Sequence, residues 1–72
     1  MANSDVIEIG GVVEEFLPAG TFRVQLESGQ MIIAHLSGKM RLNYIKVLQG
    51  DKVRVEMSQY DDKKGRIVLR MK

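Results

Sequence analysis

Apolar and polar residues alternate in several short segments of this chain, and this period of two constrains the fold more than any other feature. Along residues 21–27, Phe22, Val24 and Leu26 fall on one face, and the residues between them are polar. Such alternation is typical of strands that are buried on one side. Residues 52–57 repeat the pattern, so the sequence predicts an all-β protein.

Residues 6–16 predict one long strand with a sharp bend. They are rich in β-branched residues, and Gly10 and Gly11 interrupt them. Glycines inside a strand pattern indicate a bulge or a bend. Residues 17–20, which contain Pro18 and Gly20, predict a turn, and Ser28-Gly29 predicts a hairpin.

The return strand over residues 30–36 has apolar residues at both parities, which predicts burial on both faces over part of its length. Ser37 follows and is expected to cap a short helical segment over residues 38–45. Met40 and Tyr44 lie four residues apart, so one side of this segment can pack on the other strands.

The remainder of the chain predicts two more strands. Residues 60–65 are a polar hairpin loop, and residues 66–70 form the last strand. Three strands, a short helix and two strands predict a five-stranded Greek-key barrel of the oligonucleotide-binding (OB) type. An SH3-like barrel does not usually place a helix between its third and fourth strands. The 72 residues suffice for one domain, spanning 1–72, and the lack of cysteine excludes disulfides and thiolate metal sites.

Catalytic constellations are poorly supported. His35 is the single histidine, so neither a Cys–His pair nor a histidine cluster can form. Asp61 and Asp62 stand beside Lys63 and Lys64, which fits a solvated turn better than a pair of catalytic carboxylates. No glycine pattern matches a phosphate-binding loop. We therefore expect no enzymatic activity, no metal and no cofactor.

Charge is unevenly distributed along the chain. Residues 1–30 contain five acidic residues and one basic residue, whereas residues 31–72 contain four acidic and ten basic residues. Such an asymmetry indicates a polyanionic partner for the second part of the chain.

Two groups of basic residues could bind nucleic acid, because cations neutralise phosphates and release counterions. The first consists of Lys39, Arg41 and Lys46, and the second of Lys63, Lys64, Arg66 and Arg70. Aromatic rings offer stacking faces to bases. Tyr44 either stacks on RNA or covers the end of the barrel, Phe22 fits either a core or a stacking position, and Tyr60 lies beside the second group. His35 is a polar residue at a strand end.

Several runs of residues closely resemble the bacterial and organellar translation initiation factor 1 family. They are Ser37-Gly38-Lys39-Met40-Arg41, Asn43-Tyr44-Ile45, Gly50-Asp51-Lys52-Val53 and Lys64-Gly65-Arg66-Ile67-Val68. The resemblance covers essentially the whole chain and includes Leu17-Pro18 and Ala34-His35. It departs from the common pattern at Leu42, where many members are polar or basic, and at Ser28-Gly29-Gln30, where Asn-Gly-His is frequent.

The resemblance implies a single S1-like OB domain that binds the small (30S) ribosomal subunit at the A site. Its partners would be the decoding region of 16S-type rRNA, a neighbouring ribosomal protein, and initiation factors 2 and 3. It would block premature entry of elongator tRNA and act as a monomer. Carried onto this chain, the resemblance implies that RNA is bound by Lys39, Arg41, Asn43, Tyr44, Lys46, Lys63, Lys64, Arg66 and Arg70. The turn from Pro18 to Phe22 would face RNA too.

Two other functions are compatible with a small barrel. A general single-stranded RNA-binding module of the cold-shock type usually has several exposed aromatic residues on strands two and three, where this chain has Phe22 alone. A protein-binding adaptor is disfavoured by the basic groups. No targeting segment and no apolar run long enough for a membrane span are visible, so we expect a cytoplasmic protein with no membrane contact.

Overall fold

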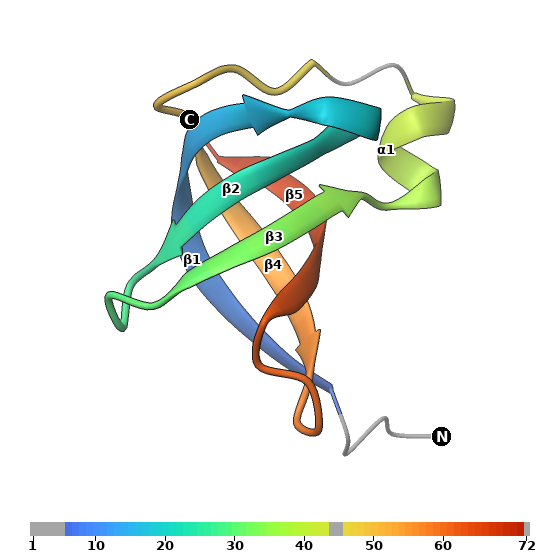
Figure 1. The fold of residues 1–72 in the computed structure, drawn as a ribbon. Helices are drawn as coiled ribbons and strands as arrows, with labels where there is room; N and C mark the ends of the chain where they lie inside the picture. Colours follow the sequence, from blue (N-terminus) through green and yellow to red (C-terminus); the bar gives the residue numbers. More distant parts are fainter. Residues whose placement is uncertain (1–5, 44–45, 72) are drawn as a thin grey trace.

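A closed five-stranded β-barrel with one short helix forms the fold, in the order β1-β2-β3-β5-β4 (Figure 1). The structure is a computed structural model that describes residues 6–43 and 46–71. Its elements are β1 (Val6–Leu17), a 3₁₀ turn (Pro18–Gly20), β2 (Thr21–Leu26), β3 (Met31–Leu36), α1 (Gly38–Leu42), β4 (Lys52–Ser58) and β5 (Lys64–Met71). The predicted all-β OB barrel, with its helix between the third and fourth strands, is confirmed.

Strand β1 closes the barrel because it pairs with two strands. Its first half is antiparallel to β4 and its second half is antiparallel to β2, and Gly11 is paired with Val53 on one side and Leu26 on the other. A Cβ atom on Gly11 would lie 2.8 Å from the carbonyl oxygen of Gln25, closer than real Cβ contacts. Glycine is therefore required where β1 bends between its two partners.

The interior is filled by one side of each strand. Its buried apolar residues are Val13, Val24, Leu26, Ile32, Ala34, Met40, Val47, Val53, Val55, Met57 and Ile67. The predicted burial of both faces of the third strand is wrong. Met31 is 46% exposed and Ile33 is 45% exposed, because a barrel wall has one inner face and successive side chains alternate across it.

Helix α1 covers one end of the barrel. The Ser37 hydroxyl accepts a hydrogen bond from the Met40 N–H at 3.2 Å, so the predicted N-cap is confirmed. The Met40 side chain is buried in the core. The helix ends at Leu42, and the predicted packing of Tyr44 lies outside the described residues.

Strand β5 begins two residues earlier than predicted, at Lys64 instead of Arg66. Residues 64–67 pair in parallel with β3, and the carbonyl of Lys63 accepts a hydrogen bond from the Ile33 N–H at 3.0 Å. The sequence of Lys64 and Gly65 gives a polar, glycine-containing pattern that is typical of a loop. Pairing with a strand far away in the chain overrides this local preference.

Candidate nucleic-acid interface

Helix α1 carries two exposed cations, Lys39 and Arg41. They flank Met40, whose burial turns the neighbouring positions toward solvent. Asn43 caps the end of the helix, and its backbone N–H donates to the carbonyl of Lys39 at 3.1 Å. This short helix therefore holds the backbone that carries Lys39 and Arg41, two of the three cations of the first predicted group.

Exposed Lys63, the last residue of the β4–β5 connection, and exposed Lys64, the first residue of β5, present part of the second group. The Asp61 carboxylate accepts a hydrogen bond from the Lys63 N–H at 3.0 Å, and the Gln30 side chain donates to the Asp62 carbonyl. Asp61 and Asp62 are exposed, and the contact that Asp61 makes shapes the turn. This agrees with their interpretation as a solvated turn.

The barrel register places the two groups on the same side of the molecule. In the parallel pair β3–β5, Ile33 is opposite Lys64 and His35 is opposite Arg66. The N–H of Ser37 then donates to the Ile67 carbonyl at 2.9 Å, and α1 begins there. Three residues of strand, about 10 Å, separate Lys64 from this point. We call Lys39, Arg41, Lys63 and Lys64 the basic rim.

Two of the other predicted cations, Arg66 and Arg70, are held by partners within the chain. Arg66 forms an ion pair with Glu56 on the neighbouring strand β4. Arg70 donates to the carbonyl of Lys46 at 2.8 Å and lies 3.8 Å from the Asp51 carboxylate. The structure thus brings Arg70 beside the backbone of Lys46, although the two belong to different groups in the sequence.

Two further ion pairs each use a glutamate of strand β1. One of their arginines, Arg23, lines a hollow of about 440 Å³ together with Lys63 of the basic rim. Arg23 contacts Glu15 at 2.6 Å, and Arg54 contacts Glu8 at 3.0 Å. We call these two contacts the β1 ion pairs. Within the part of the chain that the structure describes, the four cations of the basic rim and Lys46 form no ion pair.

A shallow hollow of about 260 Å³ is lined by residues of β1, β3, β4 and β5. Exposed His35 lines it together with Glu56, Lys64 and Arg66. His35 is thus a surface residue next to the second group of cations, as a polar strand-end residue would be. Its position was predicted, but the sequence did not show which side chains would surround it.

The aromatic residues occupy different environments. Phe22 is partly buried against the core, while Phe16 is 54% exposed, and their rings meet edge to face with centroids 5.5 Å apart. Tyr60 is 81% exposed on the β4–β5 connection. Tyr44 lies outside the described residues. Phe16 was not among the predicted site residues, although an aromatic residue directly before the Leu17-Pro18 turn is a visible signal.

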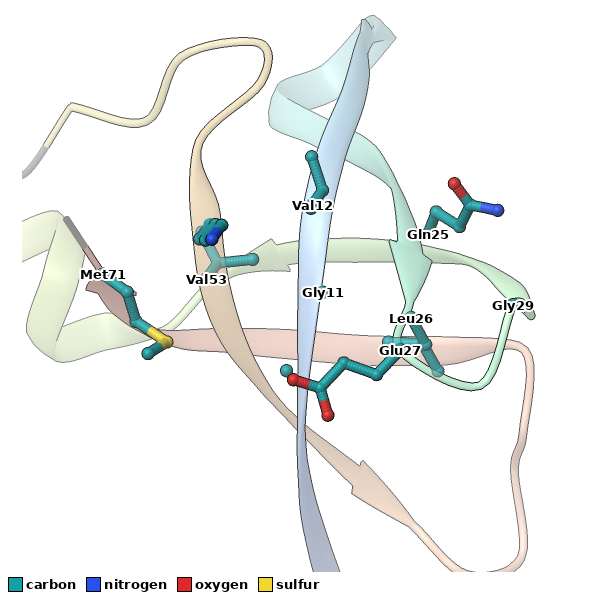
Figure 2. A pocket seen from close by; sticks show the side chains of 10 residues that line it. Gly11, Val12, Gln25, Leu26, Glu27, Gly29, Val53 and Met71 are labelled. Carbon is teal, nitrogen blue, oxygen red and sulfur yellow. The ribbon is translucent and has the colours of Figure 1, made fainter.

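A larger hollow of about 500 Å³ lies at the bend of β1, far from these cations in the register (Figure 2). Gly10 and Gly11 contribute backbone to its wall, and the Glu27 side chain reaches across β1 toward Gly10. None of the nine predicted site residues lines it. In residues 6–43 and 46–71 there is no cluster of three possible metal ligands, and no helix there has the length and apolarity to cross a membrane.

The closed barrel with strand order β1-β2-β3-β5-β4 and a helix after β3 defines an OB-fold protein with a basic rim. The model of the family "Translation initiation factor 1A / IF-1" matches residues 2–72. The chain therefore belongs to the translation initiation factor 1 family, as its sequence motifs indicated.

One solved structure agrees with this assignment, and two others have a similar fold. Translation initiation factor 1 from the Wolbachia endosymbiont strain TRS of Brugia malayi is 48% identical, with a TM-score of 0.79 over 96% of this chain and 82% of that chain. YjeQ from Thermotoga maritima is 27% identical, with a TM-score of 0.74 over 92% of this chain and 23% of that one. YloQ, a circularly permuted GTPase, is 24% identical with a TM-score of 0.77, covers 100% of this chain and 25% of that one, and shares the fold.

Proposed function

We propose that this initiation factor binds the small ribosomal subunit at the A site, against the decoding region of 16S-type rRNA and a neighbouring ribosomal protein. Bound there, it blocks premature entry of elongator tRNA and assists initiation factors 2 and 3. Membership of the initiation factor 1 family supports this proposal. We further propose that it acts as a cytoplasmic monomer, without enzymatic activity and without a cofactor.

The observation that carries the proposal is the exposure of unpaired cations on a chain whose other described arginines are paired. Lys39, Arg41, Lys63 and Lys64 are exposed and form no ion pair with a described residue. Such groups bind RNA phosphates without first breaking an internal contact, and they release counterions from the RNA. Paired Arg66 and Arg70 are better suited to shape the surface or to exchange partners.

The mechanism needs binding energy and no covalent step. A rigid basic barrel that fits the decoding region in one conformation stabilises that conformation by the difference between its two affinities. Unstacking a base costs a few kcal/mol, which phosphate contacts and stacking offset. Occupation of the A site then excludes elongator tRNA sterically.

Chemical footprinting of small-subunit rRNA, with and without the protein, tests this function. We expect protection confined to the decoding region, and loss of that protection with Arg41→Asp. Arg54→Asp introduces the same charge change at a β1 ion pair and should keep the footprint. Protection spread over many single-stranded regions, or tighter binding to free RNA oligonucleotides than to subunits, would instead support a cold-shock type of function.

A further inference from the structure

The Phe16 ring is exposed but has a fixed orientation. It is 54% exposed, yet it meets Phe22 edge to face, at a centroid distance of 5.5 Å and an interplanar angle of 82°. Phe22 packs against the core, so this contact ties the exposed ring to the barrel. A ring held in this way loses little conformational freedom when it binds a partner.

The register places Phe16 at the end of the barrel where α1 begins. Phe16 is paired with Phe22, Leu17 with Thr21, and Thr21 in turn with His35, two residues before the helix cap Ser37. Figure 1 shows the β1–β2 turn beside α1. The exposed ring therefore belongs to the same end of the molecule as Lys39 and Arg41 of the basic rim.

The surroundings of Phe16 favour a base over a phosphate. The preceding carboxylate, Glu15, is paired with Arg23 at 2.6 Å, so the charges nearest to Phe16 on β1 and β2 are already neutralised within the fold. An aromatic face gains energy from any RNA base that lies on it, whatever its identity. We propose that Phe16 stacks on an unstacked RNA base at the border of the basic rim. This inference rests on the proposed function, because the base belongs to the RNA that the rim binds.

Affinity for purified small ribosomal subunits, measured at several salt concentrations, tests the inference. Phe16→Leu removes the ring but stays apolar, and we expect it to weaken binding roughly 5- to 100-fold. Phe16→Tyr keeps the ring and should stay within about twofold of the parent. Neither change removes a phosphate contact, so the slope of log affinity against log salt should not change. Arg41→Ala, by comparison, should reduce that slope by about one.

Two controls separate stacking from loss of folding. Ile7→Ala changes an equally exposed apolar residue of β1 (47% exposed) on the half of that strand that pairs with β4, and it should bind as the parent does. All affinities are measured below the melting transition of each variant. If Phe16→Leu fails to fold, Phe16→Ser, compared with Phe16→Tyr in base-reactivity footprints, shows whether one rRNA base is covered by the ring.

Three results would overturn the inference. Parent affinity for Phe16→Leu, a shallower salt slope in that variant, or an unchanged base footprint without the ring would each exclude stacking. An affinity retained by leucine but lost with serine would identify an aliphatic protein pocket instead. If the parent protein does not bind small subunits, the proposed function fails and the inference fails with it. Parent binding with an unaffected Phe16→Leu variant overturns the inference alone.

Discussion

The β1 ion pairs and the basic rim show how cations of one type acquire different roles. Arg23 lies opposite Glu15 of β1, and Arg54, which lies opposite Gly10, contacts Glu8 two residues away on the same strand, so both charges are satisfied within the fold. The rim cations lie on the short helix α1 and where the β4–β5 connection meets the start of β5, and no described carboxylate pairs with them. The number of basic residues alone does not distinguish these two regions. The difference shows that the register between strands determines which residues lie near each cation. It therefore determines which cations are paired within the fold and which are available to bind RNA.

Salt concentration should give the largest effect. The rim and Lys46 provide about five cations for phosphates, so the log–log slope of subunit affinity against salt should be about −3 to −5. Affinity should therefore fall roughly 60- to 1000-fold between 50 and 200 mM salt. Equilibrium binding of labelled protein to purified subunits measures this slope. A slope near zero would break the comparison, because the rim would then contribute as little as the β1 ion pairs.

Removal of the rim charges should give the next largest effect. The variant with Lys39, Arg41, Lys63 and Lys64 changed to alanine should bind small subunits on the order of 100-fold more weakly, since exposed charged contacts contribute about 1 kcal/mol each at most. The matched control, Arg23→Ala with Arg54→Ala, should change affinity less than about threefold. Equal losses in the two variants would show that net charge, and not the rim, determines binding.

Loss of the helix cap should have a smaller effect that connects the fold to the rim. Ser37→Ala removes the hydroxyl that accepts from the Met40 N–H, and it should lower the free energy of unfolding by about 1 kcal/mol. Urea denaturation measures the change. Ser28→Ala is the control: it removes only a long, exposed hydrogen bond from the Gln30 N–H at 3.4 Å, and it should lower the free energy of unfolding less than Ser37→Ala does. A neutral Ser37→Ala variant would show that burial of Met40 suffices to hold the rim helix.

The smallest effect is expected at a β1 ion pair. Glu15→Gln should change the free energy of unfolding by about 0.2–1 kcal/mol, because the side chains of Arg23 and Glu15 are 46% and 49% exposed. Glu14→Gln makes the same charge change at a glutamate with no ion pair among the described residues, and thermal melts of the two are compared. A loss above about 2 kcal/mol for Glu15→Gln alone would make this pair a structural element of the barrel.

Much of the fold was predictable because local patterns and barrel geometry agree. Alternation identified the strands, Gly10-Gly11 identified the bend of β1, and Ser37 identified the start of α1. The errors arose where pairing with distant residues decided the outcome. Lys64 and Gly65 join β5 because β3 lies beside them, and Ile33 is exposed because the barrel has one interior.

The sequence predicted which residues belong to the candidate site, but it did not predict how these residues are arranged in space. The sequence identified which cations exist, and its motifs indicated which are expected to contact RNA. It could not show that Arg66 faces Glu56, or that Arg70 reaches the carbonyl of Lys46, 24 residues away. Phe16 was missed for a similar reason. The β1–β2 register shifts between Val13 and Glu15, and beyond this shift Phe16 lies beside Phe22 at the rim of the barrel.

Residues close together in the chain were enough to predict most of the strand positions, the bend of β1, the capped helix and the motifs of the initiation factor 1 family. Contacts between distant parts of the chain determine which cations are paired and which are available, and they leave the ring of Phe16 exposed at the end of the barrel where α1 begins. The physical reason is that these properties depend on the register between strands. Closure of a barrel sets that register by bringing together residues that are far apart in the sequence.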